Sequence, residues 1–443
     1  MVGIGGVGMS GLAAILLQMG KRVTGSDLKK NNLIKKLQKK GCEITIGHKK
    51  IIGKPDAVIK SYCISQSNPE IVEAKEMGIP VFDRLPLLRD LMGLHDLAVS
   101  VCGTHGKTTT TAMIVQILLK LKADPTYMIG SELISNKDSA AKGGKNIMVT
   151  ELDESDGYFS TFSSGISVIT NIEKEHLERY RTMKNMMQAY KRFADRNKKN
   201  LIIANGDDKN VKKILAGRSH DVISFGVNKQ NDFHVKNIHQ DKKGAKFDIV
   251  HSGTCLGSIR LKVGGRHNCL NALAATCVCL QLGHKFKDIS MALSGFQGAK
   301  RRFHLRLEKR RIRIIEDYAH HPTEIRAVVE NTARLKPKRL VAVFQPHRFS
   351  RSRYLLNEFS KCFSGIDWLI LTDIYAASEK PIKNISIKKL YNKIPKDSLG
   401  RVEMMKKNQI AHRIKGKLRP GDVILVMGAG DIDEIISEIK RVV

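Results

Sequence analysis

Aromatic residues are scarce in this sequence: Phe, Trp and Tyr make up 5% of its 443 residues, and tryptophan occurs once. No apolar run is long enough to span a bilayer, and no secretory signal pattern opens the chain. The eight cysteines form no CxxC pair, and several lie inside apolar runs, as is typical of buried thiols in a reducing compartment. We therefore expect no membrane insertion, no disulfide framework and a cytoplasmic location.

Acidic residues are also few: 43 Asp and Glu stand against 76 Lys and Arg, for a formal net charge of +33. A basic surplus of this size is one signature of nucleic-acid-binding proteins. The charge is spread over many short Lys-rich patches, however, and none of them is a basic stripe with interleaved aromatic residues. We interpret most of it as solvated surface that attracts anions such as nucleotides, and we expect no specific nucleic-acid partner.

The most informative stretch joins an apolar run to a glycine-bracketed loop. Leu97–Cys102 is apolar and β-branched, Gly103-Thr-His-Gly-Lys-Thr108 follows it, and apolar residues then recur at helical spacing up to Leu121. A strand, a loop ending in Lys-Thr and a helix, in this order, indicate phosphate binding. Backbone N–H groups and the helix N-terminus attract the anion, Lys107 reaches the phosphates, and the Thr108 hydroxyl can ligate Mg²⁺. The alternative is a glycine-rich turn with a surface lysine.

The N-terminal segment carries a second glycine pattern. Gly3, Gly5 and Gly8 match G-x-G-x-x-G before a helical run, and Asp27 follows after about 20 residues, the spacing of a dinucleotide-binding unit. Only two residues precede Gly3, fewer than the roughly five of a usual strand, so we expect either a truncated first strand or a start farther upstream. Further short strand–helix units predict an α/β domain over residues 1–96.

Carboxylates and one histidine follow the next strands of the chain. Strand 147–150 leads to Glu151-Leu-Asp-Glu-Ser-Asp156, and strand 166–170 leads to His176. Parallel sheets build their sites at the carboxyl ends of strands, so these groups are candidate ligands of Mg²⁺ and nucleotide. The alternatives are a solvated acidic loop and a structural histidine.

The rest of the chain predicts an insertion and a third domain. Residues 200–263 change to an alternating pattern, which we interpret as an antiparallel insertion in a central domain over residues 97–299. Asn268 and Asn271 lie one turn apart in the next helix and can read an adenine edge; the alternative is a helix cap plus an exposed amide. Strands beyond this point end in polar or glycine-rich loops, which predicts a ligand-binding Rossmann-like domain over residues 300–443.

The motifs of all three parts resemble those of the Mur ligase family. The stretches that carry the resemblance are Gly3–Gly11, Gly103–Thr111, Glu151–Asp156, Thr170–His176, Gly265–Ala272, Lys300–Phe303, Asp317–Glu324 and Gln345–Arg351. The first and last of them are the narrowest and resemble the branch that adds L-alanine. Together with the patterns above, the resemblance implies an α/β fold of three domains: an N-terminal Rossmann-like domain, a central P-loop-type ATPase domain with an antiparallel insertion, and a C-terminal Rossmann-like domain.

The resemblance implies an ATP-dependent ligase that joins L-alanine to the lactyl carboxylate of UDP-N-acetylmuramate, an early cytoplasmic step of peptidoglycan synthesis. It implies that ATP first converts the carboxylate to an acyl phosphate and that the amine of L-alanine then displaces phosphate. A carboxylate is a poor acyl donor until its oxygen becomes part of a phosphate leaving group, which is why ATP is used.

The resemblance also assigns residues to roles. It implies catalytic roles for Lys107, His176, Arg348 and Arg351. It implies ATP binding by Gly103, Thr104, His105, Gly106, Lys107, Thr108, Thr109, Asn268, Asn271, Arg302 and Asp317. It implies UDP-substrate binding by Gly5, Gly6, Val7, Gly8, Met9, Ser10, Ser26 and Asp27. It implies Mg²⁺ binding by Thr108, Glu151 and His176, and amino-acid binding by Tyr318, His320, Arg348 and Arg351. Glu151 is chosen over Glu154 because it stands 25 residues before His176.

Other interpretations stay open at this point. One is a ligase of the same superfamily that adds another amino acid or a whole peptide, a second is a basic P-loop ATPase that binds DNA or RNA, and a third is a non-catalytic copy. Glycine and L-serine differ from L-alanine by little more than a methyl or hydroxyl group, so the sequence does not separate these three nucleophiles. It does not give the oligomeric state either.

Overall fold

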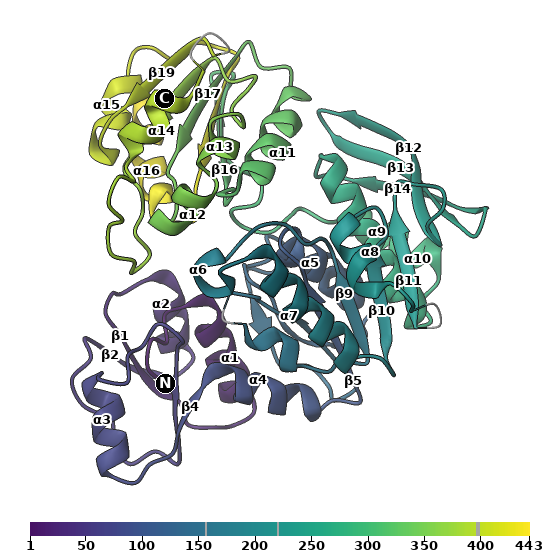
Figure 1. The fold of residues 1–443 in the computed structure, drawn as a ribbon, viewed down its shortest axis with the longest axis vertical. Helices are drawn as coiled ribbons and strands as arrows, with labels where there is room; N and C mark the ends of the chain where they lie inside the picture. The colour runs from purple at the N-terminus through teal and green to yellow at the C-terminus, as the bar shows by residue number, and fades with distance from the viewer. Residues whose placement is uncertain (156, 219–220, 396–398) are drawn as a thin grey trace.

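The computed structural model describes residues 1–155, 157–218, 221–395 and 399–443. Figure 1 shows three bodies, each built from a sheet with flanking helices: the N-terminal part at the lower left, the central part at the lower right and the C-terminal part at the top. The α/β fold expected from the sequence is thus confirmed. Within the described residues, no helix is both long and apolar enough to cross a membrane.

The N-terminal part is a small parallel sheet. Its strands are β1 (Thr24–Asp27), β2 (Glu43–Ile46), β3 (Val58–Lys60) and β4 (Val81–Asp83). Val2 forms parallel bridges to Ser26 in β1 and to Lys60 in β3, so that it joins the pairs β2–β1 and β3–β4. The expected short first strand is therefore a single bridging residue in the middle of the sheet. The helices are α1 (Val7–Gln18), α2 (Asn32–Lys39), α3 (Pro69–Glu76) and α4 (Arg84–Gly93).

The central sheet has the strand order β14-β13-β12-β11-β10-β9-β5-β8-β6-β7 over the described residues. The strands are β5 (Leu97–Cys102), β6 (Thr126–Met128), β7 (Ala140–Ala141), β8 (Ile147–Glu151), β9 (Ile166–Ile169), β10 (Leu201–Asn205), β11 (Val222–Gly226), β12 (Phe233–Asp241), β13 (Gly244–His251) and β14 (Thr254–Leu261). The expected antiparallel insertion is present but shorter than predicted. β10 and β11 continue the parallel sheet, and antiparallel pairing begins only between β12 and β13.

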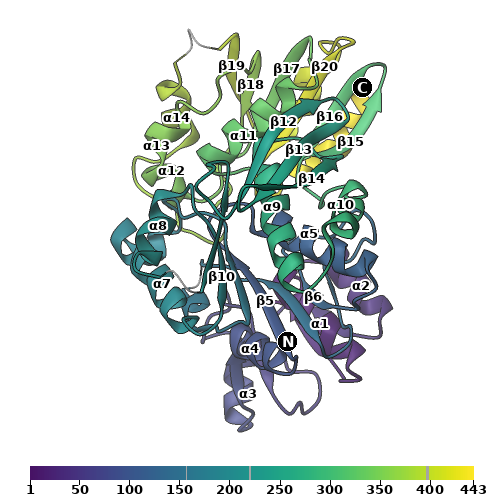
Figure 2. The ribbon, with the colours of Figure 1, turned by 90° about the vertical axis from the view of Figure 1, so that its right-hand side faces the viewer.

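Alternate residues of β5 face two different helical layers. Val99 and Val101 pack with α5 (Lys107–Lys120) and α9 (Arg266–Gln281), whereas Ala98 and Cys102 share a core with α7 (Met183–Arg196). Figure 2 shows these layers on either side of the strands. Burial on both sides explains the continuous apolar run of β5 and fixes the loop that follows it. The remaining central helices are α6 (Leu177–Tyr180), α8 (Lys209–Leu215) and α10 (Phe286–Ser294).

The C-terminal sheet has the order β15-β16-β20-β17-β18-β19, with β15 antiparallel to β16 and the other pairs parallel. Its strands are β15 (His304–Lys309), β16 (Ile312–Asp317), β17 (Arg339–Phe344), β18 (Trp368–Leu371), β19 (Arg401–Met404) and β20 (Asp422–Met427). Its helices are α11 (Pro322–Ala333), α12 (Phe349–Tyr354), α13 (Leu356–Phe359), α14 (Ile387–Lys393), α15 (Ile410–Ile414) and α16 (Ile435–Val442). Buried clusters cover both faces of this sheet.

One carboxylate joins all three bodies. Glu132 lies in the central part after β6; it accepts a hydrogen bond from Lys36 Nζ of α2 at 2.8 Å, and Lys300, in the segment that leads to β15, pairs with its other oxygen. Leu133 also forms an antiparallel bridge to Ala299. The linker to the C-terminal part is therefore fastened to the central part beside the contact with α2.

Candidate active site

The phosphate-binding loop between β5 and α5 is shaped by two glycines. Gly103 (φ 126°) and Gly106 (φ 82°) adopt backbone conformations that other residues rarely tolerate. A Cβ atom on Gly103 would lie 2.1 Å from Thr170 Oγ1, and one on Gly106 would lie 2.5 Å from Asn271 Oδ1. Gly106 is the N-cap of α5 and supplies no side-chain cap, which leaves the first turn of the helix available to an anion.

Lys107 begins α5 and pairs with a carboxylate that the sequence assignment passed over. Its Nζ atom lies 2.8 Å from Glu154 Oε2 and donates to the Gly103 carbonyl oxygen at 2.7 Å. Glu154 is fully buried. Burial alone would lower the pKa of Lys107, but Glu154 and two neighbouring carboxylates outweigh it and raise this pKa. The loop thus holds a fixed positive charge where nucleotide phosphates would lie.

The expected metal ligands fall into two groups in the structure. Thr108 Oγ1 donates to Glu151 Oε2 at 2.8 Å, and the Gly130 N–H donates to the same oxygen at 3.0 Å. Arg302 Nη2 lies 3.4 Å from Thr108 Oγ1. Hydroxyl and carboxylate oxygens side by side at the end of the phosphate loop are a donor set that fits Mg²⁺.

His176 lies with other carboxylates. Its Nε2 is 3.9 Å from Glu154 Oε1, its Nδ1 is 3.3 Å from Glu178 Oε1, and its side chain forms a group with Asp153 and Glu154. No contact between His176 and Glu151 is present among the described residues. Asp156, the last carboxylate of the motif, lies outside the described residues.

A cavity of about 370 Å³ opens next to the loop, between the central and C-terminal parts. The expected ATP-binding residues in its lining are His105, Gly106, Thr109, Asn268, Asn271, Arg302 and Asp317. The amides of Asn268 and Asn271 are linked, because Asn271 Nδ2 donates to Asn268 Oδ1 at 3.3 Å, and Asn268 also donates to the Gly264 carbonyl oxygen. Cavity residues that the sequence assignment missed include His267, Glu324 and Asn331. Of these, His267 and Glu324 lie within quoted motifs, whereas Asn331 carries no signal in the sequence.

Asp317 closes the cavity from the end of β16. Its carboxylate accepts hydrogen bonds from the N–H groups of Phe303 and Ala319, each at 2.7 Å. Burial raises the pKa of Asp317 to about 6, against the opposing effect of Arg302 and of these two hydrogen bonds. These backbone donors fix the position of the carboxylate beside Phe303, which directly precedes β15.

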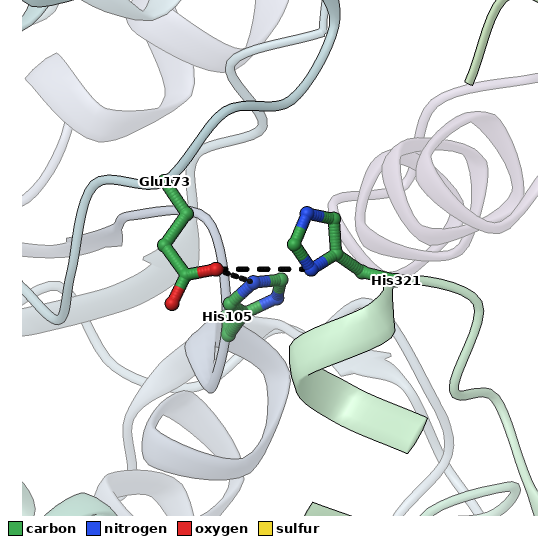
Figure 3. Close-up of side chains that lie close together, drawn as sticks. All are labelled: His105, Glu173 and His321. Atoms are coloured by element: carbon green, nitrogen blue, oxygen red, sulfur yellow. Dashed lines mark ion pairs between the residues drawn. The ribbon is translucent and has the colours of Figure 1, made fainter. Parts of the chain in front are cut away.

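Figure 3 shows a histidine of the phosphate loop at the interface with the C-terminal part. His105 Nδ1 lies 3.1 Å from Glu324 Oε1, its Nε2 lies 3.5 Å from Glu173 Oε2, and its ring centroid is 4.6 Å from that of His321. The grouping resembles a metal site, but His321 Nδ1 already accepts the N–H of Thr323 as the cap of α11. We therefore interpret the group as an ion-pair cluster between the two parts.

We expect the free energy of unfolding to depend on pH through the ion pairs of His105 in this cluster. Burial alone would lower the pKa of His105, but hydrogen bonds and charges of Glu173 and Glu324 raise it to about 9. Because this pKa exceeds the unfolded value of about 6.5, the stabilisation is complete below pH 6.5 and is lost as the pH rises through 9. The difference in free energy of unfolding between wild type and His105→Gln should shrink by an amount on the order of 3 kcal/mol between pH 6 and pH 10. Denaturant titrations of both proteins measure it, and a difference independent of pH would contradict the assignment.

The expected amino-acid-binding residues gather at the other side of the loop. Tyr318 and His320 pack edge to face with their ring centroids 5.4 Å apart. Arg351 is buried against Glu175, and Arg348, which is partly exposed, lies 3.1 Å from Glu178 Oε1. Burial, reinforced by the charge of Arg351, lowers the pKa of His320 to about 3, so that its imidazole is neutral. The structure thus brings a neutral histidine, an aromatic ring and two guanidinium groups to one end of the C-terminal sheet.

The expected UDP-binding residues form one turn at the start of α1. Asp27 Oδ2 accepts the Gly5 N–H at 2.8 Å, which fastens the glycine turn to the end of β1. A Cβ atom on Gly8 would lie 2.3 Å from Arg84 Nη1, so a larger residue here would displace the end of this arginine side chain. Ser26 is fully buried and donates to Glu70 at 2.6 Å.

Gly6 caps α1, and Val7, Met9 and Ser10 form its first turn. No pattern in the sequence indicates Arg84 or Glu70, which come from the helices α4 and α3.

Known protein families match the chain in three consecutive segments. The matched models are described as Mur ligase family, catalytic domain (residues 1–95), Mur ligase middle domain (residues 101–279) and Mur ligase, glutamate ligase domain (residues 301–430). A UDP-N-acetylmuramate–L-alanine ligase of Pelotomaculum thermopropionicum is 41% identical, in an alignment that covers 99% of this chain and 97% of the relative. The corresponding protein of Aquifex aeolicus is 39% identical, with 99% and 96% covered.

Solved structures are similar over the same length. The crystal structure of a UDP-N-acetylmuramate–alanine ligase from Thermotoga maritima has a TM-score of 0.84 at 29% identity, covering 99% of this chain and 96% of that one. A murein peptide ligase from Psychrobacter arcticus has a TM-score of 0.74 at 21% identity, covering 100% and 97%. At 21% identity, the comparison with the murein peptide ligase shows a similar fold and nothing more.

Proposed function

The chain belongs to the Mur ligase family, and we propose that it joins L-alanine to the lactyl carboxylate of UDP-N-acetylmuramate at the expense of ATP, a step of peptidoglycan synthesis. The lactyl carboxylate attacks the γ-phosphorus of ATP, the bond between the β–γ bridging oxygen and the γ-phosphorus breaks, and ADP leaves. The amine of L-alanine then attacks the acyl phosphate, and phosphate leaves as the amide forms. A cytoplasmic location, expected from the cysteine pattern and the use of ATP, belongs to the same proposal.

The residues of the phosphate loop are proposed to bind and orient ATP. Lys107 neutralises the charge that spreads over the transferring phosphoryl group, and the first turn of α5 binds the phosphates. Thr108 and Glu151 would hold Mg²⁺, which supplies Lewis-acid stabilisation of the phosphate oxygens when bound. His176, which lies with Asp153 and Glu154, would serve a neighbouring metal position. The adenosine end of ATP would occupy the cavity, with Asn268 and Asn271 at the base and Asp317 at the ribose.

The other two substrates are proposed to bind on either side of this loop. The turn of Gly5–Ser10, with Ser26 and Asp27, would receive the UDP group at the N-terminus of α1. Tyr318, His320, Arg348 and Arg351 would bind L-alanine, since guanidinium groups suit a planar carboxylate. The proposed domain boundaries are residues 1–96, 97–299 and 300–443. Each domain would then contribute the binding residues for one substrate.

The proposal rests mainly on three features of the structure that lie next to one another. The phosphate loop at the carboxyl end of β5, the pair Thr108–Glu151 and the cavity under Asp317 lie together at the interface of the central and C-terminal parts. A phosphoryl donor placed there faces the C-terminal residues expected to bind the nucleophile. This is the arrangement that a ligase with an acyl phosphate intermediate requires.

A panel of nucleophiles tests the proposal. With UDP-N-acetylmuramate and ATP, L-alanine should release phosphate at least about tenfold faster, in kcat/KM, than glycine or L-serine, because one methyl or hydroxyl group is worth about that much. A free peptide serves as the matched control for a recycling ligase, and DNA or RNA for a nucleic-acid-dependent ATPase. Faster release with the peptide, or release stimulated by nucleic acid without the muramyl substrate, would refute the proposal.

A further inference from the structure

Arg351 is held by a carboxylate from the neighbouring domain. Its Nε atom donates to both oxygens of Glu175, at 2.9 and 3.1 Å. Arg351 lies on α12 of the C-terminal part, whereas Glu175 lies in the loop between β9 and α6 of the central part, directly before His176. The two side chains are only 3% and 6% exposed, so this is a buried ion pair across the interface.

The same guanidinium group is fixed on a second side. Nη1 donates to the carbonyl oxygen of His347 at 2.8 Å and lies 2.9 Å from its Nδ1. The ring of His347 in turn stacks on Tyr375, with centroids 5.5 Å apart. Within the described ranges, no residue forms a hydrogen bond with the remaining nitrogen, Nη2. Two sides of the group are therefore occupied, and the Nη2 end is left for an anion.

Docking of the two parts does not by itself require this pair. This loop and the helix α6 that follows it contribute three other contacts: Thr323 donates to Glu173 at 2.7 Å, Lys174 donates to a carbonyl oxygen of α12, and Glu178 of α6 pairs with Arg348. These contacts involve partly exposed groups. Glu175 differs because it is desolvated, and a buried ion pair adds little net stability compared with apolar side chains of the same volume.

We infer that Glu175 is a positioning residue for the amino-acid substrate, an inference that rests on the proposed function. It orients Arg351 so that the Nη2 end receives the carboxylate of L-alanine. Because Glu175 belongs to the central part, the amino-acid site is complete only when the C-terminal part is seated on the loop that carries His176. Binding of the nucleophile is thereby tied to assembly of the nucleotide site.

Steady-state kinetics of Glu175→Gln test the inference. Glutamine keeps the shape of the side chain but removes its charge and one of the two acceptor oxygens, so Arg351 is held less firmly. The KM for L-alanine should rise about 10- to 100-fold, the equivalent of one hydrogen bond between charged groups, whereas the KM values for ATP and UDP-N-acetylmuramate should change less than about threefold. Glu175→Asp keeps the charge on a shorter chain and should give an intermediate KM for L-alanine.

The matched control is Glu403→Gln. It removes the β19 carboxylate of another Arg–Glu pair, 2.6 Å from Arg413 of α15, and should leave all three KM values unchanged. An unchanged KM for L-alanine in Glu175→Gln, or an equal rise in all three values, would overturn the inference. If Glu175→Gln does not fold, the KM ratio of Glu175→Asp decides instead. Wild-type turnover with L-alanine reports on the proposed function separately, since its absence would refute that function before any variant is compared.

Discussion

Replacing Lys107 with alanine is expected to lower the rate of ligation by about 10³-fold or more. Groups that neutralise charge on a transferring phosphoryl group have effects of about this size. The ammonium group lies at the N-terminus of α5, and neighbouring carboxylates keep it charged against the effect of burial. Phosphate release under saturating ATP, UDP-N-acetylmuramate and L-alanine measures the loss.

The loss must be separated from a folding defect, because Lys107→Ala leaves Glu154 buried without its partner. Unpaired buried charges destabilise strongly. The double variant Lys107→Ala/Glu154→Gln removes both charges and should recover thermal stability without recovering ligation. Binding of UDP-N-acetylmuramate in the N-terminal domain should survive in both. Ligation near the wild-type rate in Lys107→Ala would refute the phosphate role of the loop.

Glu151→Gln is expected to produce the second largest effect, a decrease in kcat of about 10²-fold. Glu151 is the carboxylate in contact with the Thr108 hydroxyl, and an amide is a much weaker ligand for a hard divalent cation than a carboxylate. Higher Mg²⁺ concentrations should restore part of the rate. Mn²⁺ binding, measured by electron paramagnetic resonance without substrates, gives a readout independent of turnover.

The control for this variant is Glu438→Gln, which replaces an exposed glutamate of α16. It should change neither Mn²⁺ binding nor kcat. If Glu151→Gln bound Mn²⁺ as wild type does while Glu154→Gln did not, the metal ligand would be Glu154, the carboxylate beside Lys107 and His176. The experiment thus decides between the two carboxylates of the motif.

The local elements could be predicted well from the sequence, because their signals are local. The run Leu97–Cys102 is the strand β5 at the predicted bounds, and the expected helix follows, although it already begins at Lys107, within the predicted loop. The expected strands 147–150 and 166–170 are also present, as β8 (Ile147–Glu151) and β9 (Ile166–Ile169), each within one residue of its predicted end. In each case an apolar segment is bounded by residues that end a strand, so no distant contact is needed to fix it.

Contacts between distant segments could not be predicted in this way. The pairing of Lys107 with Glu154 depends on the path of the chain after β8, and the meeting of His105 with Glu324 depends on how two domains are seated. The antiparallel insertion predicted over residues 200–263 is too long for a similar reason. A strand such as β10 takes its direction from its neighbour β9, and its own alternation of residues is compatible with either direction.

The three-way contact at Glu132 bears on the exchange of domains between related ligases. A chimaera that receives its first 96 residues from another relative would place a foreign side chain opposite Glu132 in place of Lys36, while Lys300 remains. Such hybrids would assemble best when the residues at positions 36, 132 and 300 are transferred together. The contact at this junction therefore depends on three residues from three domains, and an exchange made at the domain boundaries alone would separate them.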